Sequence, residues 1–394
     1  MSRIIEESFR VNLRVMKACH LYPPETHTRL FKILAYIMHF LLVIPVPTLG
    51  ILYVLLEDDL NMERVNYNAG FLAQTACFIT KLLPFVRYGR RIKKCIHFFE
   101  SPLFVVVKEE HKKIMDKCIK VCQRNTRIFL FCVAGGVTSW ATKPFFWEGR
   151  NFPVDIWLPF SVSTDITIYC TLYFFIATGV YFASLATGVI DPLIAGLAYH
   201  ATSQIKILKD NLQHLSEYAD EEITKRGIKN QSEQEQLKSN IIYYKIQQSV
   251  NHHDAILRFV REYEECFSSA VFSQFAASVF VICFSCLQLS KIESLGYYFV
   301  QLVMYFSVIL AQIYFYCYYG STLSEESNSL TNAIYMSNWY NFDEKSKKAL
   351  IILMERSKNP ILVTAGKILD LSLETFATIL RRSYSLLAVL KNYQ

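Results

Sequence analysis

The sequence predicts an all-α membrane protein with seven transmembrane helices, a cytoplasmic amino terminus and an extracellular carboxyl terminus. Of its 394 residues, 52% are hydrophobic and only 19% are charged, which is too apolar for an ordinary soluble enzyme of this length. Most of the 41 lysines and arginines fall in residues 1–32, 87–127, 206–261 and 345–358, which alternate with apolar stretches. Because cationic segments stay on the cytoplasmic side during insertion, this alternation predicts the orientation.

Four stretches without Asp, Glu, Lys or Arg form the clearest predicted spans. They cover residues 33–56, 166–190, 266–290 and 294–324. Each exceeds the roughly 20 residues that are needed to cross the hydrocarbon core.

Three weaker stretches complete the set of seven. Residues 65–86 carry only Lys81, residues 128–142 are free of charge but short, and residues 371–390 are interrupted by three charged side chains. Long basic side chains can extend from a short span to the lipid headgroups. We therefore expect all three stretches to cross the membrane.

Two further helices are predicted on the cytoplasmic side, where they form an anchor region. Apolar residues recur at helical spacing after the fourth span and again before the fifth, and the polar link over 219–240 is predicted to be a mobile loop. The two apolar seams are Ile194, Ala198, Ala201, Ile205, Leu208, Leu212 and Leu215, and Ile242, Ile246, Val250, Leu257 and Val260. They either pack on each other within one subunit or form an anchor where subunits meet.

The sequence offers no constellation for covalent chemistry, for a cofactor or for a metal ion. It contains no P-loop, GxSxG or HExxH motif, and His252-His253 has no third ligand within helical reach. Cys283 and Cys286 lie in an uncharged span, where they are expected to be packing residues. The basic residues flank spans, so anionic lipid headgroups account for them and nucleic acid is not an expected partner. An enzyme is therefore not expected.

A transporter is not expected either. Transporters carry buried ionisable residues near the membrane midplane and are built from two similar halves, and neither feature is evident in the first six spans. A receptor or a channel remains.

The last span favours a channel. Polar residues follow helical steps of three and four along one side of a helix whose other faces are apolar. This stripe consists of Thr375, Thr378, Arg382, Ser385, Val389 and Asn392. Turned toward symmetry mates, it would line a water-filled path with Val389 as a hydrophobic constriction. The alternative is that the same hydroxyls form hydrogen bonds across a packed helix bundle.

Three runs near the carboxyl terminus are distinctive, namely Asn359–Gly366 (NPILVTAG), Leu371–Phe376 (LSLETF) and Ile379–Ser385 (ILRRSYS). Together they resemble the carboxyl-terminal signature of insect odorant receptors. Weaker support comes from Trp339-Tyr340 and from Asp191 with the run QIKIL after the fourth span.

The resemblance implies an odorant-gated, non-selective cation channel in the plasma membrane of olfactory neuron dendrites. Such channels are tetramers, usually with a co-receptor subunit, and the seventh helix lines the pore. This chain lacks the long cytoplasmic insertion of co-receptors, so it resembles the odorant-tuning subunit. The implied pore residues are Thr378, Arg382, Ser385, the gate residue Val389, and Asn392 and Tyr393 at the outer mouth. Two of them depart from the family pattern: Tyr393 replaces a small aliphatic residue, and Arg382 puts a positive charge on a cation path.

Under this resemblance the predicted segments have the following bounds. They are a cytoplasmic amino-terminal segment over 1–31, helices one to four with the cytoplasmic connection between helices two and three over 32–198, the anchor over 199–265, helices five and six over 266–320, a cytoplasmic connection with the start of helix seven over 321–366, and the pore-lining helix seven over 367–394.

A volatile ligand offers few hydrogen bonds, so its site should be an apolar, aromatic cavity with one or two polar groups in the outer half of the bilayer. The family places it among spans two, three, four and six. The candidate residues are Phe71, Gln74, Thr75 and Phe78; Val133, Gly136 and Trp140; Tyr169, Tyr173 and Ala177; and Gln301, Leu302 and Tyr305. For any single aromatic residue among them, ordinary packing is the alternative.

Two other receptor classes stay open. A gustatory receptor of the related family would share the topology, but its last helix usually carries a Thr-Tyr pair followed by Gln-Phe, where this chain has Ser383-Tyr384-Ser385. A G-protein-coupled receptor would have the reverse orientation and an acidic residue beside an arginine at the inner end of span three, where Arg124 and Arg127 have no acidic neighbour.

Overall fold

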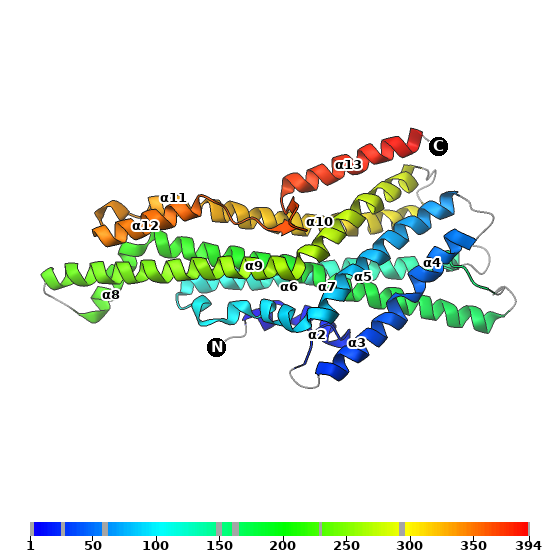
Figure 1. Cartoon of the computed structure of the whole chain (residues 1–394), viewed down its shortest axis with the longest axis horizontal. Helices are drawn as coiled ribbons and strands as arrows, with labels where there is room; N and C mark the ends of the chain where they lie inside the picture. Colours follow the sequence, from blue (N-terminus) through cyan, green and yellow to red (C-terminus); the bar gives the residue numbers. More distant parts are fainter. Residues whose placement is uncertain are drawn as a thin grey trace.

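Long α-helices laid along one axis make up almost the whole chain (Figure 1). The computed structural model describes residues 4–24, 28–56, 62–146, 152–159, 165–227, 231–290 and 296–392. The longer helices are α2 (Arg10–Ala18), α3 (Thr28–Val43), α4 (Pro45–Leu56), α5 (Met62–Ile96), α6 (Glu109–Thr142), α7 (Ile166–Gln213), α8 (Leu215–Arg226), α9 (Gln231–Ser290), α10 (Tyr297–Asn328), α12 (Glu344–Ser357) and α13 (Leu373–Asn392). The shorter elements are α1 (Ile4–Ser8), α11 (Leu330–Tyr335), the 3-10 turns η1 (Phe98–Glu100), η2 (Pro102–Phe104), η3 (Lys143–Phe146) and η4 (Trp339–Asn341), and the strands β1 (Thr364–Ala365) and β2 (Leu369–Asp370).

In the part of the chain that the structure describes, seven helical stretches have the length of a membrane crossing. Among the described residues, five are also apolar enough to cross, namely Arg29–Leu56, Asn68–Glu100, Ile166–Gln213, Glu233–Ser290 and Tyr297–Tyr335. The other two are α6 and α13, which are less apolar but contain 34 and 20 residues. A helix of 20 residues is about 30 Å long, which matches the hydrocarbon core. The all-α architecture agrees with the sequence prediction.

The first predicted span is broken near its middle. Helix α3 ends at Val43 and α4 begins at Pro45, so Ile44 lies between the two helices. Proline has no N–H to donate to the preceding turn, and it disfavours the helical conformation of the residue before it. Pro45 therefore accounts for the break.

The two longest helices, α7 and α9, extend beyond the apolar spans toward the end of the molecule that carries α8, α11 and α12 (Figure 1). The predicted seam after the fourth span is buried within the single chain along its whole length, from Ile194 to Leu215. In the second seam Ile242, Ile246 and Val260 are buried, whereas Val250 is 39% exposed. The buried members of both seams thus belong to the packed interior of one subunit, whereas Val250 does not.

The link between these seams is not the loop that was predicted. Helix α8 occupies 215–226, and α9 begins at Gln231. Gly227 ends α8 with a φ of 68°, a left-handed conformation that glycine adopts at low cost. The link is therefore polar because α8 exposes one face to solvent, not because the segment is a loop.

The last helix also starts later than predicted. Residues 321–366 were expected to contain its beginning, but α10 continues to Asn328, α11 and α12 follow, and α13 begins only at Leu373. Between them, β1 and β2 form a small antiparallel hairpin. Glu264 of α9 holds this hairpin, because its Oε1 accepts hydrogen bonds from the backbone N–H and the hydroxyl of Thr364 at 2.7 and 2.8 Å.

A buried histidine pair lies on the part of α9 that precedes its charge-free stretch 266–290. His252 of α9 is 8% exposed and donates a ring N–H to Oε1 of Gln204 on α7 at 3.1 Å. Desolvation, and then the neighbouring His253 and His111, lower the pKa of His252 to about 4. Desolvation also lowers the pKa of His253. Both side chains are therefore packed in the neutral form.

We expect acidification to destabilise this helical region. A histidine whose folded-state pKa is lowered binds its proton more readily in the unfolded chain, so stability is complete above about pH 6.5 and is lost as the pH falls toward 4. The share from His252 is at most on the order of 3 kcal/mol. Melting temperatures of the detergent-solubilised protein between pH 7.5 and 4.5 test this. His252→Gln should give a shallower loss; an unchanged pH profile would contradict the assignment.

Candidate functional site

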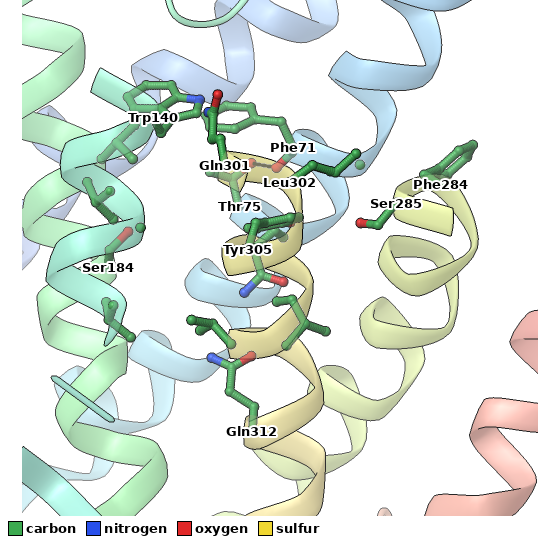
Figure 2. A pocket seen from close by; sticks show the side chains of 18 of the residues that line it. Phe71, Thr75, Trp140, Ser184, Phe284, Ser285, Gln301, Leu302, Tyr305 and Gln312 are labelled. Atoms are coloured by element: carbon green, nitrogen blue, oxygen red, sulfur yellow. Dashed lines mark hydrogen bonds between the residues drawn. The ribbon is translucent and has the colours of Figure 1, made fainter. Parts of the chain in front are cut away.

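A cavity of about 150 Å³ lies between α5, α6, α7, α9 and α10. Its wall is mostly apolar and aromatic, and a few polar side chains reach it. Figure 2 shows Trp140, Phe71 and Gln301 at one end of this cavity, Gln312 at the other end, and Tyr305 between them. A mostly apolar cavity with a few polar groups on its wall is typical of a small-molecule site.

Aromatic rings close one end of the cavity. The rings of Phe71 on α5 and Trp140 on α6 are stacked, with centroids 5.8 Å apart and planes 3° from parallel. Both rings, together with Phe152, pack against a small buried cluster that includes Val154 of the described segment 152–159. One turn from Trp140, a Cβ at Gly136 would meet no described atom within 4 Å. The glycine therefore leaves space beside the indole.

Three buried polar atoms on the wall have no hydrogen-bond partner among the described residues. They are Oε1 of Gln74, Oε1 of Gln301 and Nε1 of Trp140. An unpaired polar atom in an apolar environment costs about 1–3 kcal/mol. A ligand that pairs with these atoms would recover part of that cost.

A buried ion pair lies next to the other end of the cavity, where Gln312 bonds to it. Nζ of Lys81 on α5 lies 2.7 Å from Oδ1 of Asp191 on α7, and both side chains are 0% exposed. The carboxylate also accepts from the hydroxyl of Tyr316 at 2.5 Å and from Nε2 of Gln312 at 2.8 Å. Gln312 also lines the cavity, so one side chain links the cavity to the ion pair.

The same network reaches a fourth helix. Nε2 of Gln274 on α9 donates to Oε1 of Gln312 at 3.0 Å and to Oγ of Ser278 at 2.9 Å. The thiol of Cys77 on α5 donates to Oε1 of Gln274 at 3.1 Å. Helices α5, α7, α9 and α10 are therefore joined by one chain of hydrogen bonds.

This network corrects the expectation that the first six spans hold no buried ionisable residues. Lys81 appeared in the sequence as an isolated charge in an apolar span, and Asp191 as the residue that ends another. The structure pairs them across 110 positions of sequence. Because they neutralise each other, the pair is a structural joint and does not by itself indicate transport.

Helix α10 also connects the cavity with α13. A Cβ at Gly320 would lie 2.2 Å from the carbonyl oxygen of Leu371, so only glycine allows this approach between α10 and the segment before α13. Two residues further on, the backbone N–H of Leu373 donates to Oγ of Ser321 at 2.9 Å. The ring of Phe376 packs edge-on against Tyr314 with centroids 5.8 Å apart.

The polar stripe of α13 faces away from the rest of the subunit. Ile379 and Ser383 are buried, whereas Arg382 and Ser385 are exposed and Thr378 is half-buried. Val389 and Asn392 lie on the last turns of α13, and their side chains, like the whole of Tyr393, are outside the described part of the chain. The described part of the stripe is thus available to other subunits or to water.

One group of three potential metal ligands occurs among the described residues. It consists of Cys118 and Cys122 on α6 and His200 on α7, with ligand atoms within 4.8 Å of one another. All three side chains are buried, and the ring of His200 packs against Phe9 and Phe99. The sequence did not predict that these residues are close, because their contact depends on the packing of α6 on α7. None of them lines the cavity.

The family model of the seven-transmembrane odorant receptors matches residues 61–384. The chain belongs to the odorant receptor family. Odorant receptor Or1 of Anopheles gambiae is 26% identical over 83% of this receptor and 81% of its own length. Odorant receptor 94a of Drosophila melanogaster is 22% identical over 98% of this receptor and 97% of its own length. Of the receptor classes left open by the sequence, the match supports the odorant receptors.

A solved structure shares the whole fold of this receptor. The olfactory receptor OR5 from Machilis hrabei has a TM-score of 0.79 and covers 98% of both chains, at 13% sequence identity. The receptor is therefore a multi-pass membrane protein with the seven-transmembrane architecture of insect odorant receptors.

Ten of the thirteen candidate ligand residues of this receptor line the one cavity. They are Phe71, Gln74, Thr75 and Phe78 on α5, Val133, Gly136 and Trp140 on α6, and Gln301, Leu302 and Tyr305 on α10. The choice of residues on these three helices thus agrees with the position of the cavity.

The candidates on α7 do not line it. Tyr169 and Tyr173 lie near the start of α7, where they stack on each other and pack on Phe152 and Phe145, and Ala177 is also outside the cavity. In their place α7 contributes Val180, Ser184 and Thr187, which follow later along the helix. Periodicity identifies the face of a helix but not the depth at which it passes a cavity.

Sequence reasoning also missed the contribution of the fifth span. Helix α9 supplies Phe284, Ser285 and Gln288 to the wall. The polar pair Ser285 and Gln288, three residues apart in an otherwise apolar run, was the available signal. At the opposite end, Gln312 was missed because its role depends on Asp191.

Removing one member of the buried ion pair should destabilise the receptor strongly. Lys81→Met or Asp191→Asn leaves its partner unpaired in the interior, which costs about 3–5 kcal/mol. The double variant removes both charges and should lose clearly less than the sum of the two single losses. Thermal stability in detergent measures this cycle.

Lys113→Met, on the exposed face of α6, serves as a matched control and should have little effect. Additive losses in the double variant would show that the two charges do not depend on each other.

Proposed function

We propose that this receptor is the odorant-tuning subunit of an odorant-gated, non-selective cation channel. A small volatile molecule binds in the cavity, and a pore along α13 opens in a tetramer that includes a co-receptor subunit. The observation that carries the proposal is the exposed polar face of α13. The start of α13 is hydrogen-bonded to α10, and α10 also lines the cavity. Polar side chains on an exposed face of a membrane helix are tolerated where they line water or another subunit.

Relatives support the partner and the ligand class. The odorant receptor coreceptor of Aedes aegypti is 28% identical over 33% of this chain and 27% of its own length. The Machilis hrabei receptor has been solved in complex with eugenol, a small odorant. In the proposed assembly the receptor lies in the plasma membrane of olfactory neuron dendrites, with the α8 end in the cytoplasm and lipid around its outer faces.

Exposed apolar side chains support assembly with other subunits. Outside the apolar spans, Tyr244 and Val250 on α9 and Ile351 and Ile352 on α12 are 60%, 39%, 50% and 70% exposed. Apolar surface beyond the lipid is commonly covered by another chain. These residues belong to the proposed anchor between subunits.

The proposed mechanism is a shift between closed and open populations. A ligand that binds the open arrangement more tightly moves the equilibrium by its difference in affinity. A ligand that contacts Tyr305 and Gln312 would shift α10, because both residues belong to this helix. Helix α10 in turn contacts the start of α13 through Gly320 and Ser321. A difference of a few kcal/mol is sufficient to redistribute two states.

Arg382 is compatible with this proposal in two ways. Its side chain is exposed on α13. If only one subunit in four contributes this arginine, the other subunits supply the cation path. If α13 is rotated in the assembly, the guanidinium extends to the membrane interface.

Cysteine scanning of α13 tests the pore. Single cysteines at Thr378, Arg382 and Ser385 in receptors co-expressed with a co-receptor should react with a water-soluble thiol reagent and reduce odorant-evoked current. Cysteines at Ile379 and Ser383, which are buried against the same subunit, should not. If no position of the stripe becomes reactive in conducting channels, α13 does not line the path.

Trp140→Ala tests the cavity as the odorant site. Loss of the stacked indole removes an aromatic contact and a donor, so odorant sensitivity should fall by roughly tenfold or more, in line with the cost of a lost aromatic contact and hydrogen bond. The permeability ratio of sodium to potassium should stay the same, because Trp140 lines the cavity and is not part of α13. Dose–response curves and reversal potentials measure both quantities, and unchanged dose–response curves for every odorant would place the ligand elsewhere.

A further inference from the structure

The unpaired polar atoms of the cavity specify more than its apolar wall does. Gln74 and Gln301 are 6% and 8% exposed, and Oε1 of each is buried without a donor among the described residues. Nε1 of Trp140 is also buried, and no acceptor for it lies among the described residues. The wall therefore offers acceptors and a donor together.

Three of the other polar side chains that line the cavity have donors already in use. The hydroxyl of Thr75 donates to the carbonyl oxygen of Phe71 at 2.6 Å, and that of Thr187 donates to Ala183 at 2.9 Å. Nε2 of Gln312 donates to Asp191 at 2.8 Å. The lining atoms that are buried without any partner among the described residues are those of Gln74, Gln301 and Trp140, so a ligand gains most by pairing with them.

The chemistry of these atoms distinguishes classes of small ligand. An indole N–H can only donate, and an amide oxygen can only accept. A ketone, aldehyde, ester or ether has an acceptor for Trp140 but no donor for either glutamine, and a hydrocarbon has neither. A hydroxyl group is the smallest group that accepts from the indole and donates to an amide oxygen at the same time.

The size and lining of the cavity set the rest of the ligand. An apolar cavity of about 150 Å³ accommodates a molecule of the size of benzene. The stacked pair Phe71 and Trp140, with Phe78 and Tyr305, offers faces for an aromatic or short aliphatic body.

We infer that the cavity selects compact alcohols and phenols, with the hydroxyl oxygen accepting from Trp140 and its hydrogen donated to Gln301 or Gln74. The inference rests on the proposed function, since it names the class of odorant that the proposed site takes. This preference for hydroxyl groups holds even when a water molecule occupies the site. A ligand that displaces the water must reproduce its hydrogen bonds to gain affinity.

Matched ligand series test the inference in cells that express the receptor with a co-receptor. One series is benzyl alcohol, benzaldehyde, benzyl methyl ether and toluene, and the other is 1-hexanol, hexanal and hexane. Half-maximal concentrations of the alcohols should be at least roughly tenfold lower than those of the aldehydes and ether, which corresponds to one hydrogen bond, and lower still than those of the hydrocarbons.

Three variants separate the roles of the wall residues. Gln301→Met and Gln74→Met keep the length of the side chain and remove the amide, so at least one of them should reduce the preference for alcohols over ethers to within about threefold. Trp140→Phe keeps a ring and removes the donor, so it should weaken alcohols and aldehydes alike. Gln247→Met, on the exposed face of α9, should leave every preference unchanged.

The readout is a ratio between ligands measured on one variant, so a lower amount of receptor at the surface does not imitate the effect. Hydrocarbons or ethers that act as well as the alcohols would overturn the inference and leave the channel function intact. If no member of either series evokes a current, a wider panel of esters, ketones, terpenes and amines separates the hydroxyl inference from the proposed channel function. Currents evoked by that panel would overturn only the hydroxyl inference. The absence of any current would overturn both the hydroxyl inference and the proposed channel function.

Discussion

The ion pair between Lys81 and Asp191 is the constraint on which the arrangement of the membrane helices depends. Two ionised groups cannot remain in an apolar interior unless they meet, because an unpaired charge there costs several kcal/mol. Their contact sets α5 against α7, and the further hydrogen bonds to Gln312, Tyr316 and Gln274 bring in α10 and α9. The pair thereby determines which helices can enclose a cavity above it.

The same constraint gives the cavity a means of acting at a distance. Gln312 is at once part of the cavity wall and a hydrogen-bond donor to Asp191, so a ligand that shifts Gln312 changes the partners of a buried carboxylate. Such a network has few intermediate states, since each lost hydrogen bond leaves a buried group unpaired. Further along α10, Gly320 and Ser321 contact the start of α13. A small shift of Gln312 in the cavity can therefore be transmitted to α13, because α10 contacts both the cavity and the start of α13.

Much of this fold follows from local patterns. Gaps between charges gave the positions of the spans, the three-and-four spacing gave the seams of α7 and α9, and the polar stripe on the last span agrees with the exposed face of α13. Ten cavity residues on α5, α6 and α10 were also recognisable, because helical periodicity places side chains on one face. The misses have local causes too: a polar link proved to be helix α8, and α7 passes the cavity further along than Tyr169 and Tyr173.

By itself, the sequence determined the class of protein, the number of its crossings and the faces of its helices, since these depend on hydropathy and periodicity within a few turns. Only the tertiary structure decided that Lys81 meets Asp191, that Gln74, Gln301 and Trp140 share one cavity, and that Cys118, Cys122 and His200 lie together. Each of these contacts joins residues on different helices. Their distances depend on the depth, tilt and rotation of helices packed against one another, which no spacing within a single helix records.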